Sequence, residues 1–178
     1  MRRVFSMALV TAAILSVQGK AAADQQVDRG KYLVTVGGCN DCHTPGGLLN
    51  PDMTRMLGGG DVAFGIRGLG GAWVPPNLTP DKETGLGNWT TEQIVTAITT
   101  GVRPDGRVLA PWMPWKAFSQ LSSADAQAIA AYLKSIPALK NPTPGPFGPD
   151  EKPSRPVFTV VPGDVYASMP KLPPPPPK

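Results

Sequence analysis

One five-residue run constrains this chain more than any other feature of its sequence: Cys39-Asn40-Asp41-Cys42-His43. Two cysteines three positions apart, with a histidine directly after the second, form the C-x-x-C-H signature of covalent haem attachment. Each thiol can form a thioether with a porphyrin vinyl group, and the adjacent histidine can then ligate the iron. The run therefore predicts one haem c, held by Cys39 and Cys42, with His43 as the proximal iron ligand.

The scarcity of cysteine and histidine weighs against other uses of this run. The chain has two cysteines and one histidine, whereas a structural zinc site takes about four ligands and would need carboxylates as well. A thioredoxin-like C-x-x-C would leave the histidine unexplained and would call for a βαβ pattern, which the sequence lacks. A structural disulfide suits an oxidising compartment but also leaves the histidine without a role. Haem attachment is the interpretation that uses all three residues.

The N-terminus predicts a secretory signal peptide, residues 1–23. Arg2 and Arg3 form a positive start, residues 4–17 are mostly apolar, and a run of three alanines offers a cleavage site before Asp24. An uncleaved anchor is the alternative, but the apolar run is shorter than the about 20 residues that span a bilayer. We expect a periplasmic protein that meets the membrane only through its partners.

Most of the net positive charge belongs to this leader. The whole sequence has 17 basic and 13 acidic residues, net +4, and the leader holds three basic residues and no acidic one. The remainder therefore has 14 basic and 13 acidic residues, net +1. It has no basic cluster with interleaved aromatic residues, so we expect no nucleic-acid partner.

Capping signals and apolar residues at helical spacing predict three helices, at residues 28–36, 90–100 and 122–136. Residues 44–88, which separate the first two, are rich in glycine and are predicted to be irregular. A loop of this length inside a compact domain usually has a reason. A flat cofactor at the centre supplies that reason, because the loop can wrap around it.

Met113 is the best candidate for the distal iron ligand. It lies 70 residues after His43 in the segment Ala110-Pro111-Trp112-Met113-Pro114-Trp115, where a proline on each side restricts the backbone. A thioether is a soft, neutral ligand that suits iron. Packing in the core is the usual role of a methionine and stays the alternative. We expect Trp112 and Trp115 to form walls of the haem pocket.

Three other methionines compete for the distal position. Met53 and Met56 lie within reach of His43, because an extended chain covers about 3.3 Å per residue, but their polar and glycine-rich setting offers no rigid holder. Met169 lies in a proline-rich tail. The remaining possibilities are a lysine or another weak ligand, or an open distal position.

The haem motif and the methionine loop together resemble the class I cytochrome c family, over about residues 27–137. The resemblance implies an all-α fold with three to five short helices around one covalently bound haem, with long irregular loops. It places Met113 at the family's methionine-ligand position. It also makes Gly30 and Tyr132 the candidates for a close crossing of the first and last helices.

Two loop segments, Pro76–Asp81 and Thr84–Trp89, resemble one subgroup of these domains. Its members are electron-accepting subunits or partners of periplasmic alcohol, aldehyde and sugar-acid dehydrogenases. An ordinary surface loop rich in proline and glycine is the alternative. The resemblance implies a dehydrogenase as electron donor and an oxidase or another cytochrome as acceptor.

With both axial positions filled, the iron has no open site for substrate, so we expect an electron carrier and not an enzyme. Two alternatives stay open. A vacant or exchangeable distal site would make a gas binder or a small haem enzyme. A fixed cytochrome subunit of a dehydrogenase complex would pass charge only within that complex.

The sequence divides into the leader, a cytochrome domain at residues 24–140 and an extension at residues 141–178. From residue 137 onward there are 14 prolines in 42 residues, a composition that favours extended polyproline II. The extension is either a disordered tail or, because Val157, Phe158 and their neighbours are apolar, an arm that lies along this domain or a partner.

Overall fold

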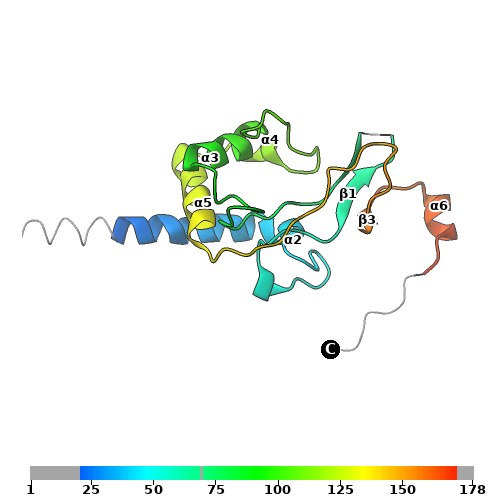
Figure 1. Ribbon diagram of the computed structural model, residues 1–178, viewed down its shortest axis with the longest axis horizontal. Coiled ribbons are helices and arrows are strands. Elements are labelled where there is room, and N and C mark those ends of the chain that lie inside the picture. Colours follow the sequence, from blue (N-terminus) through cyan, green and yellow to red (C-terminus); the bar gives the residue numbers. More distant parts are fainter. Residues whose placement is uncertain (1–20, 69, 172–178) are drawn as a thin grey trace, which may run out of the picture.

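The computed structural model describes residues 21–68 and 70–171 (Figure 1). Most of the predicted leader and the terminal proline run lie outside these residues. Within the described residues the chain is mostly helical, as expected. Five α-helices precede residue 141, in agreement with the predicted three to five, and a sixth lies in the C-terminal extension, together with a strand of a small sheet. The elements in chain order are a helix at residues 21–36, α2 (Cys39–His43), η1 (Met53–Arg55), β1 (Ala63–Ile66), β2 (Gly71–Trp73), α3 (Thr91–Thr100), α4 (Trp115–Phe118), α5 (Ser123–Ser135), β3 (Val157–Phe158) and α6 (Gly163–Ser168).

The helix boundaries follow the predicted capping signals. Thr90 and Gln93 form a reciprocal capping box at the start of α3, and the Ser122 side chain accepts a hydrogen bond from the backbone of Asp125 at the start of α5. The first helix is the exception, because it is already helical at residue 21. The added residues include three alanines, which have the highest helix propensity of all residues.

The first helix and α5 cross in contact at Gly30. A Cβ atom on Gly30 would lie 1.9 Å from the Ala128 carbonyl oxygen and 2.7 Å from the Tyr132 Cβ atom, so only glycine fits. The predicted crossing of Gly30 with Tyr132 is thus observed. An ion pair between Arg29 Nε and Asp125 Oδ1, 2.8 Å long, joins the same two helices.

The main core fills the space between these two helices, α3 and the loop before β1. Its side chains are almost completely buried, and burial of each large one contributes about 1.5–3 kcal/mol. Cys39 of the haem motif packs against this cluster. The most deeply buried members are Val34, Leu57, Ile94, Ala130 and Leu133.

A three-stranded sheet in the order β2-β1-β3 is the element that the sequence did not predict. β1 and β2 form an antiparallel pair, and β3 from the C-terminal extension adds in parallel to β1. The strands are four, three and two residues long, too short to show an alternating pattern. Their pairing places the sheet to the right of α3 and α5 in Figure 1.

The extension lies along the domain. After α5 the chain runs across to the sheet, where Phe147 pairs with Ala72 and is buried, before β3 and the short α6 (Figure 1). Three large apolar side chains of this arm, Phe158, Val160 and Tyr166, are mostly exposed. In the described part of the chain, no helix has the length and apolar character that crossing a bilayer requires.

Candidate haem site

The C-x-x-C-H run forms its own short helix, α2, directly after the first helix. Gly38 makes the break, with φ at 67°, a left-handed conformation that glycine adopts readily. Cys39 and Cys42 are three positions apart on α2, so they are neighbours on its surface. This arrangement fits attachment of both thiols to one porphyrin edge.

The two thiols lack the depressed pKa of a redox pair. Both are free in this structure. Burial raises the pKa of Cys39 to about 11, and burial with the nearby Asp41 carboxylate raises the pKa of Cys42. Redox-active cysteines need a depressed pKa, because the thiolate is the nucleophile. The thioredoxin-like alternative therefore lacks its main requirement.

His43 is the buried residue of α2, and its ring is fixed by one hydrogen bond. Nδ1 lies 2.7 Å from the Pro76 carbonyl oxygen. A carbonyl can only accept, so Nδ1 carries the proton and Nε2 keeps its lone pair. Burial lowers the pKa of His43, which favours the neutral ring. A neutral imidazole whose second nitrogen is held by a carbonyl is the usual form of a metal-ligating histidine.

The backbone around His43 is held as firmly as its ring. The Gly59 amide donates to the His43 carbonyl oxygen at 2.8 Å, and the buried Thr44 hydroxyl accepts from the Leu57 amide at 3.0 Å. Leu57 has φ at 60° although it is completely buried. Such a conformation is costly for a leucine and persists only where the surroundings enforce it. Residues 57–60 thus wrap tightly against the histidine.

Pro76 is the functional residue that the sequence reasoning missed. From the sequence, the segment Pro76–Asp81 was interpreted only by its resemblance to domains that are partners of dehydrogenases. In the structure, the carbonyl of its first residue orients the His43 ring. Two polar side chains of this segment, Asn77 and Thr79, are about 1% exposed. Polar residues confined between prolines were the only sequence signal, and such a signal does not tell which way the loop faces.

The predicted distal segment leads into α4 beside the haem motif. Met113 is half-buried, and its amide donates to the Ala110 carbonyl oxygen at 3.0 Å. At the end of α4, a ring carbon of Phe118 lies 3.8 Å from the position of a Cβ atom on Gly37, and Cys39 Sγ lies 3.9 Å from the same point. The chain therefore brings the helix that follows Met113 to the start of α2.

The two tryptophans predicted to line the pocket have different surroundings. The Trp115 ring packs against Gly101 at the end of α3, where a Cβ atom would lie 2.7 Å from the ring. Trp112 is 39% exposed. Trp115 thus anchors the methionine segment to α3, while Trp112 lies at the surface of the same turn.

The competing methionines occupy three unrelated places. Met53 begins η1 and is 54% exposed, Met56 packs against the main core, and Met169 follows α6 and is 51% exposed. None of them lies in a proline-bounded turn like that of Met113. Two thiols, one imidazole and one thioether are a set of donors that suits haem c.

Comparison with known proteins shows which family this chain resembles. A family model for cytochrome c matches residues 27–137. The chain is 34% identical over 127 residues to the fructose dehydrogenase cytochrome subunit of Gluconobacter japonicus, covering 68% of this chain and 24% of that protein. It is 35% identical over 127 residues to the alcohol dehydrogenase (quinone) cytochrome c subunit of Gluconobacter oxydans (strain 621H), covering 67% and 26%.

A third relative comes from another genus. The gluconate 2-dehydrogenase cytochrome c subunit of Pantoea cypripedii is 31% identical over 133 residues, covering 75% of this chain and 28% of that protein. The chain thus spans about a quarter of the length of these three curated relatives.

Proposed function

The chain belongs to the cytochrome c family, and on that basis we propose that it carries single electrons on one covalently bound haem c. Family membership confirms the class I fold and the resemblance to dehydrogenase cytochrome subunits that the sequence suggested. One haem is proposed because both cysteines of the chain stand in a single C-x-x-C-H run.

The observation that carries the proposal is the state of His43. The ring is buried, neutral and fixed through Nδ1 to the Pro76 carbonyl, so Nε2 is free to ligate iron. The ring makes its hydrogen bond through Nδ1, which leaves the Nε2 lone pair available as a ligand for iron.

The residues divide the work as follows. Cys39 and Cys42 would hold the porphyrin, while His43 Nε2 and Met113 Sδ would hold the iron. The group supplies, when bound, a metal that gains or loses one electron. Filling both axial positions leaves no site for a substrate, so we propose a carrier and not an enzyme. Met/His ligation and a buried site both raise the reduction potential.

The partner and the compartment are part of the proposal. The relatives are named as cytochrome subunits of dehydrogenases, so we propose a periplasmic dehydrogenase as donor and an oxidase or another cytochrome as acceptor. Residues 1–23 would direct export, and the membrane would be met only through these partners. A fixed subunit is the second candidate, supported by the subunit names and by the exposed apolar side chains of the arm.

Purification from the periplasm tests these points together. The mature protein should begin at Asp24, have the mass of the chain plus one haem, and show no thiol that reacts with a maleimide. Reduction by a co-purified dehydrogenase, followed by stopped-flow absorbance, should be complete in one phase with one electron per chain. Colourless protein or reactive thiols would contradict the proposal, and a tight complex that survives gel filtration would favour the fixed subunit.

A further inference from the structure

Asn77 follows Pro76, whose carbonyl holds His43, and both the oxygen and the nitrogen of its side-chain amide are fully hydrogen-bonded. It is 1% exposed. Its Oδ1 accepts from the Thr79 backbone amide at 2.9 Å and from the Thr79 hydroxyl at 2.8 Å. Its Nδ2 donates to Thr84 Oγ1 at 3.0 Å and to the Leu139 carbonyl oxygen at 2.7 Å. Four hydrogen bonds thus tie Asn77 to two segments, one of them about 60 residues away.

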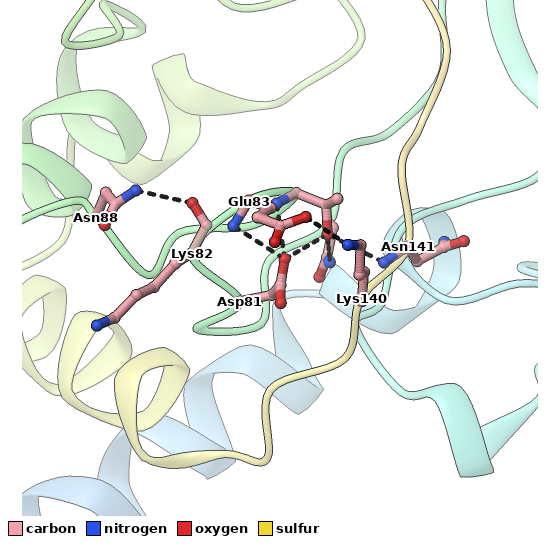
Figure 2. Close-up of polar contacts among 8 residues, drawn as sticks. Asp81, Lys82, Glu83, Asn88, Lys140 and Asn141 are labelled. Atoms are coloured by element: carbon pink, nitrogen blue, oxygen red, sulfur yellow. Dashed lines mark hydrogen bonds and ion pairs between the residues drawn. The ribbon is translucent and has the colours of Figure 1, made fainter.

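The same network continues through Thr84 and Asn141. The Asn141 backbone amide donates to Thr84 Oγ1 at 3.0 Å, and the Thr84 hydroxyl donates to Asp81 Oδ1 at 2.7 Å. Figure 2 shows this contact of the loop at residues 81–88 with the segment that follows α5. The Asn141 side chain in turn donates to the Gly58 carbonyl oxygen at 2.6 Å.

The network ends at Asn77 and at Gly58, and each of these residues is next in sequence to a residue that is hydrogen-bonded to His43. Pro76, which accepts from the ring, precedes Asn77; Gly59, which donates to the His43 carbonyl oxygen, follows Gly58. The segment after α5 therefore bridges the two stretches of chain that fix the histidine. Buried amides left without partners are costly, so the bridge forms as a unit or not at all.

We propose that Asn77 is a positioning residue for the proximal iron ligand, acting through Thr84 and Asn141 as a clamp that keeps the Pro76 carbonyl on His43 Nδ1. The inference rests on the proposed role of His43 as that ligand. It assigns the loop Pro76–Asp81 an internal task that is separate from any contact with a dehydrogenase.

The clamp has a measurable consequence at the iron. A hydrogen bond from Nδ1 to a carbonyl makes the imidazole a stronger ligand and favours the oxidised iron, which carries the extra positive charge. When the clamp is loosened, this bond weakens, so the reduction potential should rise. The Nδ1 proton should also exchange faster with water, because the loop opens more often.

Four variants separate the clamp from general loop damage. Asn77→Ala removes the central amide. Thr84→Val removes the shared hydroxyl with little change of shape, whereas Thr84→Ser keeps the hydroxyl and removes only the methyl group. Asn88→Ala is the matched control, because Asn88 also donates its amide to a loop carbonyl, that of Lys82 at 2.8 Å, but is exposed and lies outside the clamp (Figure 2).

The test uses the purified holoprotein and isotope-labelled histidine, which gives one ring signal because the chain has one histidine. Asn77→Ala and Thr84→Val should raise the potential and speed Nδ1 proton exchange roughly tenfold, with methionine ligation retained in the absorption spectrum. Thr84→Ser and Asn88→Ala should match the wild type. If Asn77→Ala gives no holoprotein, the Thr84 pair decides.

Two results would overturn the clamp and leave the proposed ligation intact. The first is a Thr84→Val protein whose Nδ1 proton exchange rate and reduction potential equal those of the wild type. The second is an Asn88→Ala protein in which these two quantities change as much as in Thr84→Val. A wild-type protein without an iron-shifted signal from His43 would instead overturn the proposed ligation, and the clamp would fall with it.

Discussion

The two sides of the candidate haem site are built in opposite ways. On the proximal side, His43 is buried and is held by Pro76 and Gly59, which are distant from it in sequence. On the distal side, Met113 is half-buried in a short turn whose hydrogen bonds are local, from Met113 to Ala110 and from Trp115 to Met113. One side is fixed by tertiary contacts, the other by prolines and nearest neighbours.

This difference indicates where the site can change. A ligand held by several distant segments moves only if those segments move together, whereas a local turn can open by itself. Besides Phe118 near Gly37 and the Leu109 amide, which donates to the Gly101 carbonyl oxygen, the distal segment is anchored to α3 by the packing of Trp115 on Gly101. We infer that ligand exchange and responses to partners occur on the methionine side, while the histidine side sets the resting properties.

The largest effect should come from His43→Ala. The loop at residues 44–88 is irregular for most of its length, so the bound group must supply part of the folding free energy. Loss of the proximal ligand should lower the yield of holoprotein roughly tenfold or more. Haem-stained gels of periplasmic extracts measure this yield. A normal yield of folded holoprotein would show that the proximal side does not depend on His43.

Met113→Ala should have a smaller but still large effect, without loss of the fold. The potential should fall by a sizeable part of the about 0.8 V over which axial ligands set haem potentials, and cyanide or carbon monoxide should bind. Redox titration and ligand-binding spectra measure both changes. Met53→Ala is the matched control, because this exposed methionine is a rival ligand; if it changes the potential and Met113→Ala does not, the assignment is wrong.

Gly101→Ala tests the packing of Trp115 on the end of α3, an anchor two residues from Met113. A Cβ atom at this position would meet the Trp115 ring, and φ is 76°, so the substitution also costs about 1–2 kcal/mol for the left-handed backbone. We expect cyanide to bind the oxidised protein roughly tenfold faster, because the methionine turn opens more often.

The control for this variant is Gly106→Ala. Gly106 has φ at 79° with nothing within 4 Å of a Cβ atom, so it has the same backbone cost without the clash. Stopped-flow cyanide binding should separate the two variants. Equal rates would show that backbone strain, and not the position of Trp115, controls the distal side.

What the sequence predicted well is local in origin. The caps of α3 and α5 depend on side chains within three residues, and the C-x-x-C-H run carries its chemistry within five. The crossing at Gly30 was expected from the family resemblance, and it depends on the absence of a side chain at this one position. Each of these features can be recognised without knowledge of the tertiary fold.

What the sequence could not show depends on pairing across long distances. The contact of Pro76 with His43 spans 33 residues, and its acceptor is a backbone carbonyl, which leaves no mark in the sequence. β3 pairs only two residues with β1, about 90 positions earlier, and such short strands lack a periodic pattern. The roles of Asn77 and Asn141 became visible only when the loop was seen to face inward.

The smallest effect should come from a contact remote from both sides, the ion pair of Arg29 with Asp125. The hydrogen bond from Arg29 lowers the pKa of Asp125. A carboxyl group with a lowered pKa stabilises the folded state above its unfolded pKa, about 3.9, and this contribution is lost as the pH falls through the folded value. Both side chains are partly exposed, so the contribution is small.

Arg29→Met should therefore lower the urea midpoint of the holoprotein slightly near neutral pH. The difference from the wild type should shrink below about pH 4 and disappear once the pH has fallen through the lowered pKa of Asp125. The potential and the rate of cyanide binding should not change, because neither iron ligand contacts this pair. A difference that persists in acid would assign the loss to packing of the Arg29 stem on Tyr32, whose ring centroid is 5.5 Å from the guanidinium. A shift in cyanide binding would show that the crossing of the first helix with α5 also controls the distal side, and the two sides would no longer be independent.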